Sequence, residues 1–421
     1  MSDKQIFAAT EISDHEVRLI VGEFFNTRFN IIKVERIPCD GLSFNKVVNA
    51  EAITGALKKA AENTKKMLGA DIKKILLAMP SYRLKRYSVR STVNIDGIDG
   101  KITIQDVRNA VEKAESVSIG KEYALIQTVC VKYIINGIAT RRIPLGEKCD
   151  QMSVDIDLLC ADRKLSYDLV TCVEKAGLQV LDIFPDIYAV GKEAALFEQS
   201  VNKQVVVLKV ERYNTTLGLL RKGRLMTAAV MPTGIGTLVQ PVAEKYGIPV
   251  NTAVELLKYS VRLDQKVCSS NPVHIWSAEG KTHTISEQQL VDCVRNDVDL
   301  WLNAIQKTCE PILQAGETTV IITGEGGETE GLDHLIRDRL QTEVRYYIPD
   351  TLGGRNAGLT AALGLFYAYQ DKMPVYGYAE DSLDMDAFEK AVSYRDKTPG
   401  STNKEDTITS KLKGLFLEGK K

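Results

Sequence analysis

Three short segments with strand-like patterns open the chain. They are IFAATEI from Ile6, VRLIVGEFF from Val17 and FNIIKVERIP from Phe29, and short polar turns separate them. Apolar residues that alternate with polar ones, or run together between polar turns, predict an antiparallel meander of strands. Apolar residues at helical spacing then predict a helix over 50–68, and the apolar run over 74–80 predicts a buried strand. Together these elements make one α/β half.

The same pattern returns from Gln204. The segments VVVLKVERYN, TTLGLL and RLMTAAVMP follow one another with turns between them, and a buried strand over 320–322 completes the second set. Because an α/β half must bury one face of its sheet, this repetition predicts two similar halves that face a shared cleft.

The second set ends in TTVIITGEGGETEGL, where a strand runs into glycines and then into a helix over 332–340. Gly324, Gly326 and Gly327 have no Cβ, so their backbone can approach a ligand closely. This is the layout of a nucleotide-binding turn, and a glycine-rich turn is also common in ordinary loops. The order of the elements before it favours the nucleotide interpretation.

Two blocks interrupt the halves. The first, over 84–160, contains the strand patterns RYSVRSTVNI and ALIQTVCVKYII, the helix pattern ITIQDVRNAVEKA and a last strand MSVDIDLLCA. Thr103 is placed to cap this helix, with Asp106 three residues on. The second block, over 234–313, contains helix patterns and a strand pair. These blocks predict one inserted subdomain in each half.

Helix patterns over 187–198 and 353–369 belong to the halves themselves, and the second has a face of small residues that would let it pack tightly. From Gln370 the sequence becomes acidic and then polar, which predicts a flexible linker.

The chain then ends in TITSKLKGLFLEGKK, whose apolar residues recur at helical spacing. An apolar stripe beside cations is typical of a membrane-surface segment, and a helix that docks on its own domain would show the same stripe. Because a polar stretch separates this segment from the fold, we favour the membrane anchor. The membrane-binding residues predicted here are Ile408, Leu412, Leu415, Phe416, Lys411 and Lys413.

Composition narrows the function further. The 54 basic and 55 acidic residues give a net charge of −1, which provides no overall field for nucleic acid. The start of the chain has no signal-peptide pattern, and no run of about 18 apolar residues occurs, so a cytoplasmic protein is expected. The eight cysteines form no CxxC motif, which favours reduced thiols over a zinc site or a disulfide framework.

With these features in place, the chain resembles the FtsA family of bacterial cell-division proteins, in the actin and heat-shock-chaperone ATPase superfamily. The resemblance runs over essentially the whole length and is most specific at GLSFNKVVNAEAITGAL from Gly41, ITIQDVRNAVEKA, the RRIPLG stretch, AVELLKY from Ala253, TGEGG and the tail. It implies an α/β, actin-like fold of two duplicated halves around a cleft. It also implies an inserted strand-helix-strand-strand (SHS2) subdomain that mediates self-association, and a C-terminal amphipathic tail.

The resemblance predicts a division of the chain by residue ranges. These are 1–83 and 161–202 for the first half, 84–160 for the SHS2 subdomain, 203–233 and 314–369 for the second half, 234–313 for its insertion, 370–406 for the linker and 407–421 for the membrane-targeting segment.

The residues expected to meet a nucleotide divide into two groups. Positions on the adenosine side match the family, and these are Glu255 and Lys258, one helical turn apart and so on one face, with Gly324, Gly326 and Gly327. The phosphate loops depart from it, because the first turn from Glu11 has acids and no glycine, and Lys209 stands where an aspartate is expected. A cation at that place repels Mg²⁺.

We therefore expect poor Mg²⁺ binding and weak or absent ATP binding, and we assign no catalytic residue and no metal ligand. Two arrangements remain open. The cleft is closed by an ion pair between Glu11 and Lys209, or a nucleotide is held without metal by Lys209 and Arg212. We prefer the empty or weakly occupied cleft, because Asp14 and Glu16 add negative charge beside any phosphate.

The resemblance implies a scaffold that tethers the FtsZ ring to anionic lipid of the cytoplasmic membrane, on its inner face, polymerises with itself and meets other division proteins. The FtsZ contact would lie within 234–313. Two alternatives stay open: a pilus-assembly adaptor resembling PilM, and an active ATPase or sugar kinase of the same superfamily. A kinase needs an aspartate base, and Asp186 is the placed candidate, although capping of the following helix explains it better.

Overall fold

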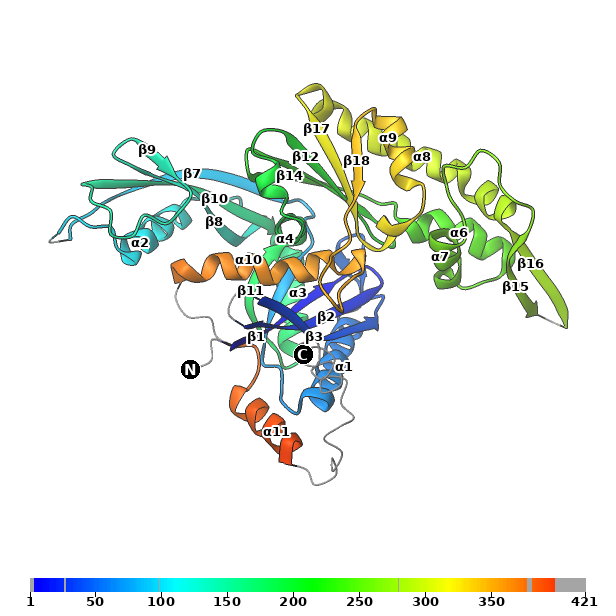
Figure 1. The fold of residues 1–421 in the computed structure, drawn as a ribbon, viewed down its shortest axis with the longest axis horizontal. Coiled ribbons are helices and arrows are strands. Elements are labelled where there is room, and N and C mark those ends of the chain that lie inside the picture. The colour runs from blue at the N-terminus through cyan, green and yellow to red at the C-terminus, as the bar shows by residue number, and fades with distance from the viewer. Residues whose placement is uncertain (1–3, 26–27, 98, 279, 377–380, 398–421) are drawn as a thin grey trace, which may run out of the picture.

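A computed structural model describes residues 4–25, 28–97, 99–278, 280–376 and 381–397. The chain forms two central five-stranded sheets, and one further unit projects beside each of them (Figure 1). We call the unit around the N-terminal sheet the first half and the unit around the other central sheet the second half.

The first half contains the predicted meander. Strands β1 (Lys4–Ile12), β2 (Glu16–Phe25) and β3 (Arg28–Pro38) pair antiparallel, and β6 (Lys74–Met79) and β11 (Gln179–Pro185) extend the sheet in parallel, in the order β11-β6-β1-β2-β3. A two-stranded hairpin of β4 (Leu42–Ser43) and β5 (Lys46–Val47) follows the meander.

Helix α1 (Ala50–Leu68) covers one face of this sheet. Its start is capped by the side chain of Asn49, and it ends at Gly69 in the left-handed region, with φ of 79°. The buried side chains of α1 include Ile53, Leu57 and Ala60, which are spaced as one helical face.

The second half repeats the arrangement strand for strand. Strands β12 (Gln204–Val210), β13 (Thr215–Arg221) and β14 (Arg224–Met231) form the meander, and β17 (Thr318–Thr323) and β18 (Glu343–Tyr346) extend it in parallel, in the order β14-β13-β12-β17-β18. The predicted duplication is confirmed, and equivalent turns of the two halves face one cleft.

The unit inserted in the first half is a separate four-stranded sheet with one helix. It comprises β7 (Lys85–Asn94), α2 (Ile104–Glu115), β8 (Tyr123–Ile135), the short β9 (Ile138–Thr140) and β10 (Gln151–Asp162), with strand order β7-β10-β8-β9. Thr103 and Asp106 form the predicted capping box at the start of α2. The apolar face of α2 and the inner face of the sheet form their own core.

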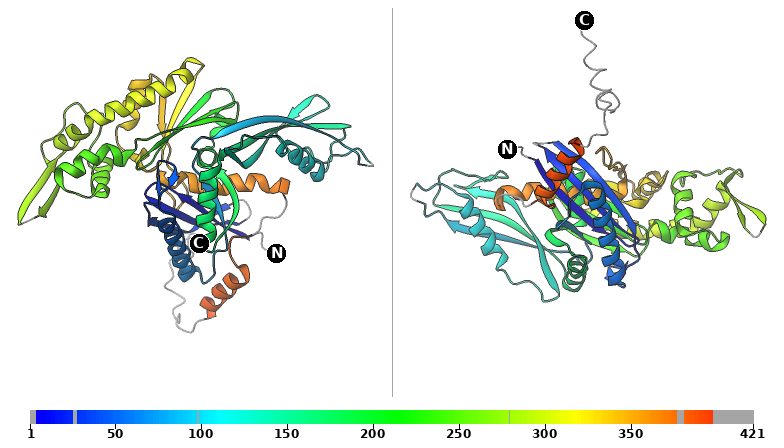
Figure 2. Two further views of the ribbon diagram at one scale, coloured as in Figure 1. Left: turned by 180° about the vertical axis from the view of Figure 1, so that it is seen from behind. Right: turned by 90° about the horizontal axis from the view of Figure 1, so that it is seen from below.

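The insertion of the second half is mostly helical and extends away from the first half (Figures 1 and 2). It contains α6 (Ile235–Tyr246), α7 (Val250–Tyr259), the hairpin of β15 (Pro272–Ala278) and β16 (Lys281–Ser286), and the long helix α8 (Glu287–Gln314).

The remaining helices join these units. They are α3 (Arg163–Lys175), α4 (Asp186–Glu193), α5 (Leu196–Gln199), α9 (Leu332–Leu340) and α10 (Thr360–Tyr376). The prediction of a single helix over 187–198 is wrong, because Ala195 takes a positive φ of 49° and divides it into α4 and α5. The predicted tight packing of α10 is confirmed, since a Cβ at Gly364 would lie 1.8 Å from the Ala189 carbonyl oxygen of α4.

The linker predicted over 370–406 is also wrong in its first part. Helix α10 continues to Tyr376, and residues 381–384 lead into α11 (Met385–Lys397) beneath the first half. Leu383 and Phe388 are buried in the first-half core, and Ser382 Oγ accepts a hydrogen bond from the Ala8 amide at 2.8 Å. Apolar residues scattered among acids were enough to dock this segment.

The predicted membrane-binding residues of the tail, from Ile408 to Phe416, lie outside the described residues. Within the described ranges, no helix is both long and apolar enough to cross a membrane.

Candidate functional site

Four segments meet where the two halves face each other. The first two are the β1–β2 turn with the strand ends beside it, over 11–16, and the corresponding β12–β13 segment, over 209–214. The other two are η1 (Glu325–Glu328), which follows β17, and the start of α4 at Asp186. Ends of equivalent strands in duplicated halves lie at one cleft, so side chains distant in sequence meet here. Most of these side chains are charged, and those that form ion pairs across this region are buried, except for His15, which is half-buried.

Arg18, on β2, is the most deeply buried of these groups. Its side chain is fully buried, and it donates to Glu11 at 3.0 Å, to Glu16 at 2.6 Å and across the cleft to Glu211 at 2.7 Å. Burial alone would lower the pKa of Arg18, but Glu211 and Glu11 outweigh burial and raise it well above its usual value. The cation is therefore held permanently among three carboxylates.

Lys209, at the end of β12, is the second cation of the cleft. Its Nζ forms an ion pair with Glu11, donates to Asp186 Oδ2 at 2.8 Å and lies 3.8 Å from Glu211. Burial would lower the pKa of Lys209, and the carboxylates of Asp186 and Glu11 raise it instead. The ion pair predicted between Glu11 and Lys209 is present, and it joins the two halves.

A third group of contacts involves Asp14 and His15. Asp14 Oδ2 accepts hydrogen bonds at 2.7 Å from both the Tyr213 amide and the Asn214 side chain, which again joins the halves. His15 Nδ1 lies 3.0 Å from Asp14 Oδ1, and His15 Nε2 lies 3.3 Å from Glu325 Oε2. Burial would lower the pKa of His15, but its contacts with Asp14 and Glu325 raise it.

Arg212 also contacts Glu325, and its Nε donates a hydrogen bond to Glu325 Oε2 at 2.9 Å. Burial would raise the pKa of Glu325, and Arg212 and His15 lower it far more. We call the set of Glu11, Asp14, His15, Glu16, Arg18, Asp186, Lys209, Glu211, Arg212 and Glu325 the cleft ion-pair network.

The glycines of the TGEGG turn pack against the protein itself. Gly324 has a φ of 89°, and a Cβ there would lie 2.5 Å from the Val210 carbonyl oxygen. A Cβ at Gly326 would lie 2.6 Å from Val210 Cγ1. These two glycines therefore let η1 approach the end of β12, while a Cβ at Gly327 would make only ordinary contacts with Ile322.

Glu255 and Lys258 both lie on α7, three residues apart, but they differ in burial. Lys258 is 4% exposed, and its Nζ lies 3.7 Å from Glu328 Oε2. Glu255 is exposed. Residues three apart lie about 60° apart around a helix, and here the boundary between buried and exposed surface passes between them.

The cavity left beside the network is small. It has a volume of about 20 Å³ and is lined by Glu11, Asp186, Lys209, Glu211, Asn214 and Thr216 among others. This is room for about one water molecule, whereas pockets for small ligands span roughly 300–1,000 Å³. A nucleoside triphosphate does not fit unless the ion pairs separate.

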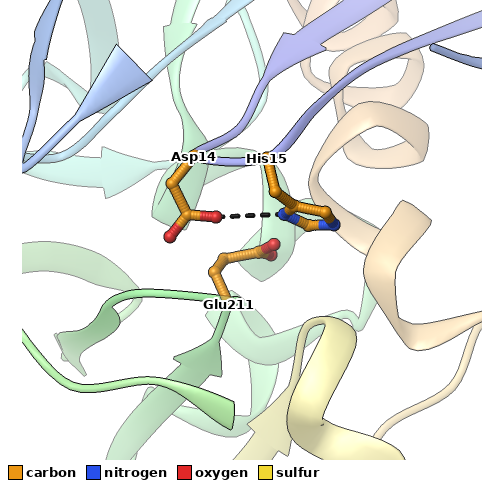
Figure 3. Close-up of side chains that lie close together, drawn as sticks. All are labelled: Asp14, His15 and Glu211. Carbon is orange, nitrogen blue, oxygen red and sulfur yellow. Dashed lines mark hydrogen bonds and ion pairs between the residues drawn. The ribbon is translucent and has the colours of Figure 1, made fainter. Parts of the chain in front are cut away.

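Asp14, His15 and Glu211 lie close enough to be considered as ligands for a metal ion, and Figure 3 shows them facing one another across the cleft. Their possible ligand atoms lie within 4.8 Å of one another. However, both Glu211 oxygens accept hydrogen bonds from Arg18, and Asp14 Oδ2 accepts two more. A divalent ion would lie beside the Arg18 cation, so this set does not fit a metal.

Sequence patterns identified only part of this network. Arg18 and Glu325 were not singled out, although a charged residue within the apolar run VRLIV is a detectable signal for Arg18. Glu325 gave no separate signal, because its role depends on Arg212 in the β12–β13 turn, 113 residues earlier in the chain.

The duplicated halves around a cleft, with an inserted strand-helix-strand-strand unit, define the actin-like ATPase fold. Among solved structures, the PilM–PilN type IV pilus biogenesis complex matches with a TM-score of 0.57 and 14% identity, over 85% of this chain and 97% of that one. That likeness supports the fold alone.

Sequence comparisons show similarity to FtsA proteins. Residues 82–160 match the SHS2 domain inserted in FtsA. The chain is 22% identical to cell division protein FtsA of Bacillus subtilis, over 87% of this chain and 83% of that protein, and 19% identical to FtsA of Enterococcus hirae, over 99% of each. The predicted resemblance to FtsA is confirmed over most of the chain, and residues 82–160 match its inserted SHS2 domain.

Proposed function

We propose that this protein is an FtsA-like cell-division scaffold whose cleft is held closed by ion pairs instead of by a nucleotide. The observation that carries the proposal is the contact of Arg18 with Glu211, supported by Lys209 with Glu11 and by Asp14 with Asn214. Each contact joins the first half to the second. In an ordinary ATPase of this fold, bound nucleotide and metal would bridge the halves.

The same side chains disfavour hydrolysis of ATP. Phosphoryl transfer needs a metal ion that neutralises the phosphates and backbone amides that reach them. Lys209 and Arg18 supply fixed positive charge, but carboxylates already neutralise both, and Val210 fills the space beside Gly324 and Gly326. Catalysis by this cleft is not expected, and no residue is assigned as a base.

The remaining parts of the scaffold follow from the FtsA relationship. The tail over 407–421 would bind anionic lipid at the inner face of the cytoplasmic membrane, and the SHS2 domain would join one copy to the next. The insertion over 234–313 would receive an acidic segment of FtsZ, for which Lys245, Arg262 and Lys266 are the nearest cations. Other division proteins would assemble on the resulting polymer.

Co-sedimentation tests this proposal as a whole. Purified protein, FtsZ and vesicles containing anionic lipid are pelleted together, with and without magnesium ATP. We expect FtsZ to pellet only when both the protein and the vesicles are present, and to the same extent in both nucleotide conditions. FtsZ recruitment that requires ATP would contradict a nucleotide-independent scaffold, and no recruitment in either condition would contradict the tethering role.

A further inference from the structure

The turn between β13 and β14 brings the second half into contact with the SHS2 domain. Arg224, the first residue of β14, reaches Asp157 on β10, and its Nε donates to Asp157 Oδ2 at 2.7 Å. The other end of the guanidinium bonds Asp157 Oδ1 and donates to Ser88 Oγ on β7 at 2.9 Å. This is a two-point contact between a carboxylate and a guanidinium, which fixes relative orientation as well as distance.

Asp157 is held in place from both sides. Its side chain is 4% exposed, Arg86 lies 3.2 Å from Oδ1, and Ser88 Oγ donates to Oδ1 at 2.8 Å. Removal of Arg224 would leave the buried Asp157 carboxylate with fewer cations to balance its charge, and such a loss is strongly destabilising. Because Arg224 and Asp157 belong to different units, we expect the loss to weaken the attachment of the SHS2 domain to the second half.

Helix α10 also contacts the SHS2 domain. Arg108 Nε on α2 donates to the Val375 carbonyl oxygen at 2.8 Å, and the Val375 side chain belongs to the SHS2 core. Figure 1 shows α10 running from beneath the SHS2 domain across the centre of the molecule. The SHS2 domain is thus attached to the first half by its chain ends, to α10 by Val375 and to the second half by Arg224.

We propose that the Asp157–Arg224 contact couples the orientation of the SHS2 domain to closure of the cleft. β14 moves with the second half, because it pairs with β13 and, through it, with β12, which carries Lys209 and ends beside Glu211. If the halves separate at the cleft ion-pair network, β14 therefore carries Arg224 away from Asp157. By thermodynamic reciprocity, release of the SHS2 domain weakens closure of the cleft.

Hydrogen exchange on the full-length protein tests this coupling without reference to FtsZ or lipid. Arg224→Met is compared with Arg221→Met, a matched change at the exposed partner residue in the same hairpin. We expect amides of β10 to exchange about tenfold faster in Arg224→Met and at the native rate in Arg221→Met. Arg224→Lys keeps the charge without the two-point geometry, so we expect it to give an intermediate exchange rate. It replaces Arg224→Met in the comparison if Arg224→Met folds poorly.

The second arm opens the cleft and observes the SHS2 domain. Glu211→Gln weakens the contact with Arg18, and it should accelerate exchange in β10 as well as in β12, while the distant hairpin of β15 and β16 stays at the native rate. In Arg224→Met, this additional effect of Glu211→Gln on β10 should disappear. Equal rates for the two arginine variants, or a Glu211→Gln effect confined to the cleft strands, would overturn the proposal.

Discussion

Arg18 and Glu211, which belong to different halves of the chain, are joined by two hydrogen bonds across the cleft. The Arg18 nitrogens lie 3.2 Å and 2.7 Å from the Glu211 oxygens. Burial tends to raise the pKa of Glu211, and Arg18 and Lys209 oppose that shift. Neither residue can lose its partner without leaving a charge in a region from which water is largely excluded.

Replacement of Arg18 is therefore expected to be costly. Arg18→Met removes the cation that three carboxylates share, and breaking buried pairs of this kind costs about 3–5 kcal/mol. Arg36→Met is the matched control, because Arg36 also contacts Glu16 but its side chain is 38% exposed. Urea unfolding should show a large decrease in the free energy of unfolding for Arg18→Met and a small decrease for Arg36→Met. Equal decreases would refute the role given to Arg18.

Closure of the cleft should weaken as pH rises through the titration of His15. The folded-state pKa of His15 is raised, so its contribution to stability is complete below the unfolded value of about 6.5 and is lost as pH rises through the folded value. The charged groups that face this imidazole are Asp14, Glu16, Glu211, Glu325 and Arg18. As pH rises from about 6 to about 8.5, the native chain should therefore lose more thermal stability than His15→Gln.

The two proteins differ only at this residue, so the difference between the two curves isolates His15. Glu16 does not interfere, because burial would raise its pKa but Arg18 holds it at about 2. Identical pH dependence in the native chain and in His15→Gln would contradict the bridge from His15 to Glu325.

The docked segment over 381–397, which includes α11, should contribute to the stability of the first half. Phe388 is 8% exposed within the first-half core, so Phe388→Ala should cost about 3 kcal/mol of unfolding free energy. Glu389→Ala changes an exposed neighbour on the same helix and should be close to neutral. If both variants unfold at the same denaturant concentration as the native chain, α11 is not docked in solution.

The tail prediction concerns residues outside the described ranges and rests on sequence spacing. Burying Phe416 at a membrane surface stabilises by about 1.5–3 kcal/mol, and each nearby lysine adds about 1 kcal/mol on anionic lipid. Phe416→Asp should abolish sedimentation with anionic vesicles, whereas Ser410→Asp, with the same charge change on the opposite face, should retain most of it. Equal sedimentation of a chain ending at Asp406 would exclude the anchor.

The sequence predicted the elements that depend on local pattern and missed those that depend on distant partners. The duplicated meanders, the Thr103 cap and α1 follow from apolar spacing and capping chemistry, which act within a few residues. The ion pair of Glu11 and Lys209 was also predictable, because opposite charges occupied equivalent positions of the two repeats.

Arg18 and α11 show why the rest was not predictable. Nothing near Arg18 in the sequence indicates Glu211, since the contact exists only once both halves have folded. The segment before α11 is acidic and polar on average, and its docking depends on a few residues such as Leu383 that fill a gap in the first half. Composition averages over a window, whereas packing depends on individual side chains.

We propose that the cleft ion-pair network occupies the place of a nucleotide. Isothermal titration of the native chain with ATP, with and without Mg²⁺, tests it most directly, together with phosphate release as the measure of turnover. We predict no binding or weak binding that Mg²⁺ does not strengthen, and no turnover above background. Tight magnesium-dependent binding with turnover at an ordinary ATPase rate, lost in Lys258→Ala, would contradict it.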